Sequence, residues 1–569
     1  MIDELGYIRG VIMRICFVSN LNMGSWYSDC EPRELSPPLG LLSLAAVLEK
    51  VGHQVSLFDF NYALLKDEIS FDEDFYTNIA TRIENLSPHV VGFSTMCNSY
   101  HIALRMAEAV KARLPEVPII FGGPQASVVD VETLEAFPFV DMVLRGEAEE
   151  TLPRLIDDLF RGQVPAKVLG LTHRVKGRVV RNPDAPLLSD MDSLPIPAYH
   201  IFPYGTGGAS AIDIGRGCPF SCSFCSTSKF WRRQFRLKSI ERIIQEMWLL
   251  KQEYNATCFT FMHDIFTANP QWLHAFCDRL QAEKLEVTWS CSARVDTVDL
   301  QLLRHMADAG CRAIFYGVET GSRRMQRHIR KNLRLEKVLS TVDATIDAKM
   351  STTLSFIAGF PTETKEDLSQ TMDIIQALLL RPGVDVQLHI LAPQIGTLDY
   401  DRYMERLRFD GYYSDIVGVS YKFLEPDWFR RYPRLFSSFY YFETDELPRQ
   451  LLRGLDIFIH GPCSVMRGTI LHLLTKNRNL WDLYLEWRDW ADSRGLGGGP
   501  MAGQRLDQFL LDFYAFASDQ IATGRVDFDL GHTRDEILAF YLRHYCQVPI
   551  RFVSLSTAET SPQIAEERG

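Results

Sequence analysis

The sequence lacks any long apolar run. In its 569 residues no stretch approaches the ~18 uninterrupted apolar residues that a membrane-spanning helix needs. The N-terminal residues MIDELGYIRG also lack the basic start and apolar centre of a secretory signal. We therefore expect a cytoplasmic protein without a membrane span.

A basic excess is also missing. Acidic residues (72) outnumber basic residues (60), and the formal net charge is -12. Because attraction to phosphate groups dominates nucleic-acid binding, we expect no nucleic-acid partner. The glycine-rich GLGGGPMAG near residue 497 follows a helical pattern rather than a strand, so we interpret it as a connector and not as a phosphate-binding loop.

Cysteine is too scarce for a disulfide-stapled scaffold, with 12 residues in the chain. Three of them, Cys218, Cys222 and Cys225, lie within eight residues of one another. In a reducing compartment such a cluster indicates metal binding. The other nine, such as Cys16 and Cys97, sit in apolar runs, and we expect them to be buried as small hydrophobic side chains.

The first segment, residues 1–160, alternates short β-branched runs with helical patterns. Buried strands that alternate with helices are typical of a parallel, doubly wound sheet, so we expect an α/β, Rossmann-like domain. Residues 161–204 contain a hairpin pattern and a proline-rich strap, and we interpret them as a linker. The strand-like runs of the first segment include RICFVS, QVSLFDF and VPIIFGG.

The second segment, residues 205–400, predicts a partial (βα)6 barrel of the TIM type. Its active site should lie at the carboxyl ends of the strands. Residues 401–569 are mainly helical in pattern, which predicts an α-helical C-terminal domain. The six strand-like runs of the barrel are SAIDIG, CFTFMH, VTWSCS, AIFYG, TLSFIAG and VQLHILAP.

The cysteine cluster directly follows the first barrel strand. Cys218-Pro-Phe-Ser-Cys222-Ser-Phe-Cys225 is a C-x3-C-x2-C pattern with no fourth cysteine or histidine nearby. A structural zinc normally closes its tetrahedron with four protein ligands. A [4Fe-4S] cluster held by three thiolates instead leaves one iron open for a substrate or cofactor. Zinc with a distant fourth ligand remains the alternative.

This pattern on a sixfold βα chain resembles the radical S-adenosylmethionine (SAM) superfamily. The resemblance implies a [4Fe-4S] cluster on the three cysteines, SAM bound to its open iron, and reductive cleavage of SAM to a 5'-deoxyadenosyl radical. It also implies roles at the strand ends. Phe224 matches an aromatic residue near the adenine, and Asp264 stands where the family binds the SAM ammonium, although the usual form there is Gly-Gly-Glu. The remaining implied SAM residues are Ser292 and Arg294 for the carboxylate, Glu319 for the ribose, and Ser355 and Gly359 in the fifth-strand motif.

A doubly wound domain binds its ligand at the carboxyl edge of the sheet. Glycines there allow close backbone approach, and small hydroxyl residues can bond to a polar ligand. By themselves these features fit a nucleotide or flavin site, or a domain with no ligand. The candidate residues are Ser36, Leu39, Gly40, Ser94, Thr95, Gly122, Gly123, Gln125, Gly146 and Glu147.

Together with the second segment, the first resembles the cobalamin-binding domain of the B12-dependent radical SAM enzymes, in which PPLGLL, GGPxA and RGExEET recur. The resemblance implies cobalamin at the residues just named. The sequence has no Asp-x-His-x-x-Gly motif, and Gln125 stands where many relatives have histidine. We therefore expect base-off cobalamin without a histidine ligand, and we expect His53 and His101 to be surface or helix-cap residues.

The resemblance implies modification of an unactivated carbon, most simply by methyl transfer from methylcobalamin. Two alternatives stay open. The same architecture performs cyclisation, rearrangement or oxidation without net methylation, and FCSTSKFW is similar to the anaerobic cyclase of chlorophyll-type ring formation. An iron–sulfur scaffold that binds SAM without turnover is the other.

The partners implied are a small-molecule or peptide substrate and an electron donor such as flavodoxin or ferredoxin. We expect the helical C-terminal segment, which contains the aromatic-rich run FRRYPRLFSSFYYFETDELPR (429–449), to cover the barrel mouth and to shape the choice of substrate. Aromatic residues at helical spacing are also typical of a packed core, and this alternative stays open.

Overall fold

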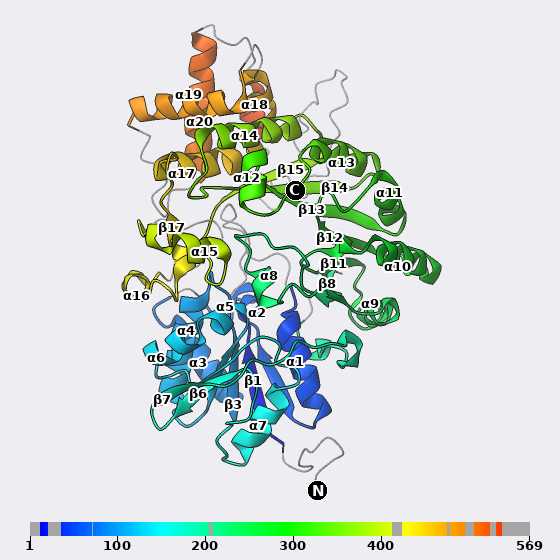
Figure 1. Ribbon diagram of the computed structural model, residues 1–569, viewed down its shortest axis with the longest axis vertical. Coiled ribbons are helices and arrows are strands. Elements are labelled where there is room, and N and C mark those ends of the chain that lie inside the picture. The colour runs from blue at the N-terminus through cyan, green and yellow to red at the C-terminus, as the bar shows by residue number, and fades with distance from the viewer. Residues whose placement is uncertain are drawn as a thin grey trace, which may run out of the picture.

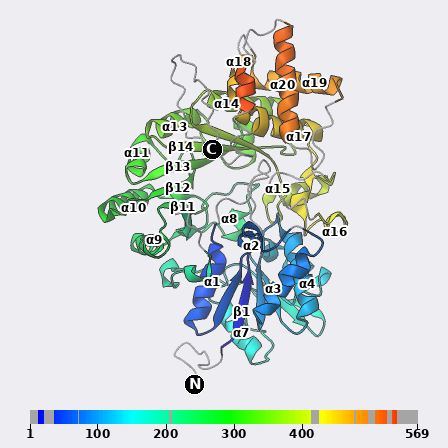
Figure 2. The same cartoon turned by 180° about the vertical axis from the view of Figure 1, so that it is seen from behind.

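The computed structural model describes residues 12–20, 36–70, 72–203, 209–411, 424–474, 478–495, 506–523 and 531–537. An α/β domain lies at the N-terminal end of the molecule, a second parallel sheet with its helices lies next, and a group of helices lies at the opposite end (Figure 1). Seen from behind, α15 (Leu398–Tyr403) and α16 (Pro426–Arg431) lie between the first domain and the C-terminal helices (Figure 2).

The N-terminal sheet has the strand order β2-β1-β3-β4-β5-β6-β7. Its first five strands are parallel, which confirms the doubly wound sheet. Because the strand order reverses between β1 and β3, the carboxyl ends of these two strands form the expected ligand position. The strands are Arg14–Val18, Gln54–Phe58, Val90–Ser94, Ile119–Gly122, Met142–Leu144, Leu171–Val175 and Arg178–Arg181, from β1 to β7.

The hairpin β6–β7 lies within the segment that the sequence assigned to a linker. It extends the N-terminal sheet instead, because β6 pairs antiparallel with β5 through partners such as Met142 and His173. A free strand edge carries unpaired amide and carbonyl groups, and the hairpin satisfies those of β5.

Helices cover both faces of this sheet. Ile15 and Phe17 of β1 pack toward α1 and α7, whereas Cys16 and Val18 pack toward α3 and α4. This alternation follows from the two-residue period of a strand. The helices are α1 (Leu39–Lys50), α2 (Phe60–Leu65), α3 (Phe75–Asn85), α4 (Tyr100–Arg113), α5 (Pro124–Val128), α6 (Asp130–Ala136) and α7 (Leu152–Phe160).

The second sheet has the order β15-β14-β13-β12-β11-β8, with every pair parallel. It confirms the expected partial barrel of six βα units. Along β14, Leu354 and Phe356 are buried beneath the outer helices, whereas Ser351 and Thr353 face the interior hollow. The strands are β8 (Ala209–Asp213), β11 (Cys258–Met262), β12 (Thr288–Ala293), β13 (Cys311–Glu319), β14 (Ser351–Ala358) and β15 (Val384–Ile390).

The outer helices of the barrel begin where the sequence places polar start signals. The Asn269 side chain accepts a hydrogen bond from Trp272 N, and Thr364 forms a capping box with Asp367. Such caps satisfy amide groups that the first helical turn leaves free. The helices are α9 (Ile240–Tyr254), α10 (Pro270–Glu283), α11 (Leu300–Asp308), α12 (Arg323–His328), α13 (Glu336–Asp347) and α14 (Lys365–Leu379).

The C-terminal part is mainly helical, as expected, with one short antiparallel ladder of β16 (Leu407–Arg408) and β17 (Tyr441–Phe442). Among the described helices, none combines the length and the apolar character that crossing a bilayer requires. The run near residue 497 lies outside the described residues. The helices are α17 (Arg449–Phe458), a π-helical turn (Ile459–Cys463), α18 (Arg467–Leu473), α19 (Leu480–Ser493) and α20 (Leu506–Ala522).

Most of the other described cysteines are buried, as expected. Burial raises the pKa of the Cys16 thiol to about 12, so this side chain stays neutral and packs as an apolar group. Two residues depart from the expectation. Cys97 is half-buried, and Cys258 is exposed at the start of β11, because alternate residues of that strand face the open hollow of the barrel.

Candidate active site

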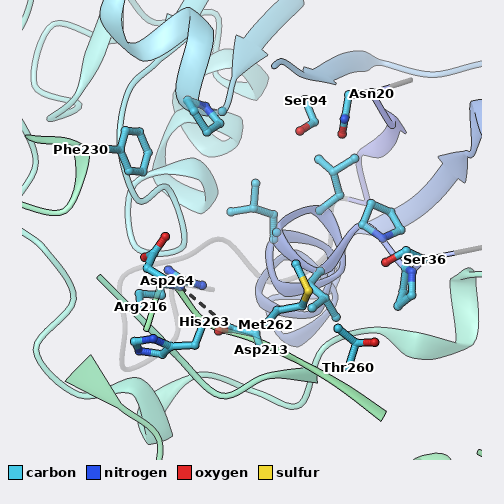
Figure 3. Close-up of a pocket in the computed structure, with 18 of the residues that line it drawn as sticks. Asn20, Ser36, Ser94, Asp213, Arg216, Phe230, Thr260, Met262, His263 and Asp264 are labelled. Carbon is cyan, nitrogen blue, oxygen red and sulfur yellow. Dashed lines mark ion pairs between the residues drawn. The ribbon is translucent and has the colours of Figure 1, made fainter. Parts of the chain in front are cut away.

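A cavity of about 870 Å³ lies between the N-terminal sheet and the interior of the barrel. We call it the chamber. In Figure 3, Ser94, Asn20 and Ser36 of the N-terminal domain lie on one side of it, and Thr260 and Met262 of β11 lie on the other. The volume falls within the range of about 300–1,000 Å³ typical of ligand pockets. The chamber therefore joins the two edges at which the sequence predicts cofactors.

The N-terminal part of the chamber is an apolar slot between the sheet and helices α1 and α7. A Cβ on Gly92 would come within 2.9 Å of the Phe17 ring, so glycine keeps β3 close to β1 here. At Gly40 and Gly146 the position of a Cβ has no atom within 4 Å and opens into free space. The slot therefore fits a flat, largely apolar group. Its apolar lining is Ile15, Phe17, Leu41, Leu44, Val90, Ile120, Leu144, Leu152 and Ile156.

Most of the residues expected to bind cobalamin line the chamber. Thr95 and Gln125 do not. The Thr95 hydroxyl donates to Gly122 O at 2.7 Å, and the buried Gln125 amide donates to Leu435 O at 2.9 Å. Gln125 thus holds the C-terminal segment instead of facing a ligand. The expected residues on the lining are Ser36, Leu39, Gly40, Ser94, Gly122, Gly123, Gly146 and Glu147.

A buried ionic network joins the two domains at the chamber wall. Arg216 lies on β9 (Gly215–Arg216) and bonds to Glu147 Oε1 at 2.8 Å and to Glu149 Oε1 at 2.5 Å. Glu147 Oε2 also accepts from Arg236 at 2.8 Å. Burial alone would raise the pKa of Glu149, but the charge and hydrogen bond of Arg216 outweigh burial and hold that pKa below its usual value.

The three cysteines lie on the loop between β9 and α8 (Thr227–Phe230), and all three are half-buried. Gly217 has φ +92° and leaves no room for a Cβ against Gln234 O, and its amide donates to Asp264 Oδ2 at 3.0 Å. Burial raises the pKa of the Cys222 thiol to about 11, and nearby Lys331 opposes this shift. Asp264 therefore anchors the start of the cysteine loop.

The cysteine loop carries three thiol donors. Among the described residues, no three histidine, cysteine or carboxylate side chains converge on a point that could hold one ion. The zinc alternative requires such convergence. An iron–sulfur cube instead binds each thiolate at a different iron. Three thiols on one loop supply the number of protein ligands that such a cluster with one open iron needs.

The structure separates the expected SAM residues into those that line the chamber and those that do not. Asp264 and Ser292 line the chamber. Arg294 makes two bonds of 2.9 Å to Asp296 and stacks on Phe220, with 4.0 Å between the guanidinium carbon and the ring centroid. The structure therefore shows Arg294 paired with a neighbouring carboxylate.

The other expected SAM residues do not line the chamber, and one of them, Phe224, lies on the cysteine loop itself. Glu319 accepts from Lys331 Nζ at 2.6 Å and has φ +69°, a left-handed conformation. Phe224 packs edge-on against Phe360, with 5.9 Å between the ring centroids. Two more, Ser355 and Gly359, lie on and directly after β14.

The two histidines considered as cobalt ligands lie away from the chamber. His53 accepts from Met13 N at 3.5 Å. His101 is fully buried on α4 and contacts Phe429 and Phe439 edge-on, with centroid distances of 5.4 and 5.1 Å. The expectation of a surface or cap position was wrong for His101, because the C-terminal aromatic residues cover it.

That cover comes from residues 424–442, which we call the C-terminal clamp. The Arg105 side chain on α4 bonds to both oxygens of Glu425 at 2.7 Å and lies 4.0 Å from the ring centroid of Trp428. Phe436 and other aromatic residues of the clamp join the core of the N-terminal domain. Aromatic residues of this run therefore pack as core against α4, which confirms the alternative to a cover over the barrel mouth.

Sequence reasoning missed Arg216, Arg236 and the slot. Arg216 stands two residues before Cys218, and the acidic RGEAEE run offers its partners, but a charge match between distant segments is not a local pattern. The slot residues were interpreted as ordinary core strands. Phe230 and Trp231, in the run noted for its similarity to a cyclase, also line the chamber.

Residues 212–375 match the radical SAM superfamily, and residues 31–156 match the B12 binding domain. An uncharacterized methyltransferase of Pyrococcus horikoshii is 31% identical over 63% of this chain and 77% of that protein. The chain belongs to the cobalamin-dependent radical SAM enzymes. Family membership assigns it the expected cofactors, a [4Fe-4S] cluster, SAM and cobalamin.

Two further comparisons place this radical SAM enzyme among its relatives. An anaerobic magnesium-protoporphyrin IX monomethyl ester cyclase of Synechocystis sp. is 29% identical over 52% of this chain and 60% of that protein. The solved structure of the cobalamin-dependent S-adenosylmethionine radical enzyme OxsB, with aqua-cobalamin and S-adenosylmethionine bound, superposes with a TM-score of 0.59 at 14% identity, over 93% of this chain and 84% of that chain. The shared fold thus extends beyond the two matched domains.

Proposed function

We propose that this radical SAM enzyme methylates an unactivated carbon of its substrate. The observation that carries the proposal is the single chamber, which runs from the slot in the N-terminal domain to Asp264 and Ser292 beside the cysteine loop. Groups held at these two places would face one shared space. The similarity to a protein named as a methyltransferase supports the same reaction.

We assign cobalamin to the N-terminal domain, residues 1–160 with the hairpin that completes its sheet. The slot would hold the planar nucleotide base of cobalamin. The glycine backbones at the sheet edge would contact its corrin ring. We assign the cluster and SAM to residues 205–400 and treat residues 401–569 as the helical part that holds the clamp. When bound, the cluster supplies the electron that cleaves SAM, and cobalamin supplies the methyl group.

The side chains at the strand ends would orient SAM. Asp264 lines the chamber and carries a carboxylate suited to an ammonium group. Ser292 also lines the chamber and carries a hydroxyl that can bond to a carboxylate. Because Arg294 already binds Asp296, we assign Arg294 to supporting the cysteine loop through Phe220. We assign Phe224, Glu319, Ser355 and Gly359 to the adenosyl side.

Phe230 and Trp231 border the chamber next to the cysteine loop. We propose that they exclude water from the radical step, since a site without water limits side reactions. The half-buried cysteine loop leaves a short path from the surface for an electron. A donor such as flavodoxin or ferredoxin would supply it.

Cyclisation or oxidation without net methylation is the second candidate. The similarity to the cyclase and the run FCSTSKFW (224–231) favour it. Both candidates use the same cofactors and the same chamber, so the products distinguish them.

The test uses anaerobic holoprotein, SAM carrying a trideuterated methyl group, a low-potential reductant and a small-molecule extract of the source cells. Methylation predicts deoxyadenosine and S-adenosylhomocysteine together, with a deuterated methyl group on a new product seen by mass spectrometry. Deoxyadenosine without S-adenosylhomocysteine would favour cyclisation or oxidation. The absence of both products would contradict the proposed function.

A further inference from the structure

We propose that the barrel part of the chamber binds an uncharged or cationic molecule with an apolar body, and that it rejects anions. This inference rests on the proposed function, because it assigns the substrate to the part of the chamber that the cofactor sites leave free. It concerns the chemical class of the substrate, which neither the fold nor the family decides.

The barrel part is lined by a row of inward-facing residues on neighbouring strands. Thr260 pairs in register with Ser290, Ser290 with Ala313, and Ala313 with Ser351. All four line the chamber. They lie in the first half or the middle of their strands, whereas the cysteine loop follows the carboxyl end of β8. Small side chains therefore leave this space open at a distance from the cluster loop.

The charged residues of the lining are mostly acidic. Among the described lining residues Arg216 is the only arginine, and there is no lysine. Arg216 is already bound to Glu147 and Glu149. On the barrel side the charged lining residues are Asp213, Asp264 and the exposed Asp385. Of these, Asp213 is paired with Arg216 at 3.5 Å. An anionic substrate would lose its hydration next to carboxylates without gaining a cation.

Histidine does not change this balance. His263 lines the chamber, and burial lowers its pKa to about 4, so it is neutral near physiological pH. Its Nδ1 accepts from Ile265 N at 2.9 Å. It therefore offers no positive charge to a carboxylate or phosphate group.

Two large apolar side chains remain open to the chamber. Met262 is 48% exposed and Phe315 is 38% exposed, although their neighbours Phe261 and Tyr316 are buried. Both line the barrel part. Exposed apolar surface of this kind gains free energy when an apolar ligand covers it. The surrounding serine and threonine hydroxyls supply hydrogen bonds, so an amphipathic molecule is the best match.

The test titrates holoprotein, with cobalamin bound in the slot, with three probes of equal chain length: 1-octanol, octylamine and octanoate. Calorimetry should detect binding of octanol or octylamine, with octanoate weaker by at least about tenfold. Asp385→Lys should strengthen octanoate binding and weaken octylamine binding, each by about tenfold. Ser351→Trp should fill the space beside this row of residues and remove octanol binding, whereas the control Leu380→Trp, exposed outside the chamber, should not.

Octanoate binding as strong as that of octanol, or no binding of any probe, would overturn the inference. Octanol binding that survives Ser351→Trp would overturn its location. Cobalamin absorbance and SAM cleavage are measured in the same preparations. Their loss would count against the proposed function, whereas the probe series alone decides the charge preference.

Discussion

Arg216 and Glu149 lie 2.5 Å apart across the boundary of the two domains. Arg216 stands two residues before Cys218, and Glu149 follows the strand end that opens the slot. Their contact therefore ties the cysteine loop to the edge of the N-terminal sheet. Ser43 on α1 donates a further hydrogen bond to Glu149 at 3.0 Å.

Removing Arg216 should destabilise the protein strongly. Arg216→Leu leaves the buried Glu149 without a cation and leaves Glu147 with Arg236 alone, which costs about 3–5 kcal/mol. We expect a large fall in Tm and weaker cobalamin binding, with a smaller effect for Arg216→Lys. Arg408→Leu, which breaks an exposed pair with Glu443, should cost about 0–1 kcal/mol. Equal shifts for the two leucine variants would contradict the role of the network.

Cys222→Ala should abolish cluster assembly and all SAM cleavage. Two thiolates cannot hold the cube that three support. Iron and sulfide analysis of anaerobically reconstituted protein, with deoxyadenosine measured in parallel, provides the readout. The matched control is Cys258→Ser, which changes an exposed cysteine away from the loop and should keep full iron content. Full iron content in Cys222→Ala would refute the assignment of this residue.

Gly40→Leu should weaken cobalamin binding without unfolding the protein. The site of a Cβ at Gly40 faces free space on the chamber wall, so a larger side chain fits but occupies that space. We expect at least about a tenfold loss of affinity, measured by equilibrium absorbance titration of cobalamin. Gly40→Ala should lie between this variant and the parent. Unchanged affinity in Gly40→Leu would place cobalamin elsewhere.

The C-terminal clamp should depend on Arg105. Arg105→Ala removes two charge-assisted bonds to Glu425 and the stacking on Trp428, which together should cost about 1.5–3 kcal/mol. Denaturant unfolding of Arg105→Ala, Glu425→Gln and the double variant measures the coupling. If the two single losses simply add in the double variant, the pair does not interact as described.

Glu363 should make stability depend on pH. Burial raises its pKa to about 8, and Gly359 N donates to its Oε2 at 2.7 Å. The folded state binds this proton more tightly than the unfolded state, whose pKa is near 4.5. The resulting stability is present below that value and is lost as pH rises toward 8, by up to about 1.4 kcal/mol per pH unit.

Glu363→Gln removes the titrating group while keeping the acceptor oxygen. Unfolding free energies measured from acid to mildly alkaline pH should show a flatter slope in the variant and higher stability near pH 8. An unchanged slope would show that another group titrates in this range.

Local patterns carried the prediction of both sheets. The short apolar runs of the strands, the caps at Asn269 and Thr364, and the spacing of the three cysteines each involve neighbouring residues. Their physical causes act within one element, so the sequence reveals them. The resemblance to the radical SAM superfamily supplied Asp264 and Ser292, and parallel strands bring both to one edge at their carboxyl ends.

By itself the sequence determined the two sheets, the cysteine loop and the family that these motifs resemble. Only the tertiary structure decided that Gln125 holds Leu435, 310 residues away, that Arg216 pairs with the acidic run, and that the clamp covers His101. Such contacts depend on which surfaces meet after folding. Charge pairing and burial between distant segments leave no period or spacing in the chain from which they could be predicted.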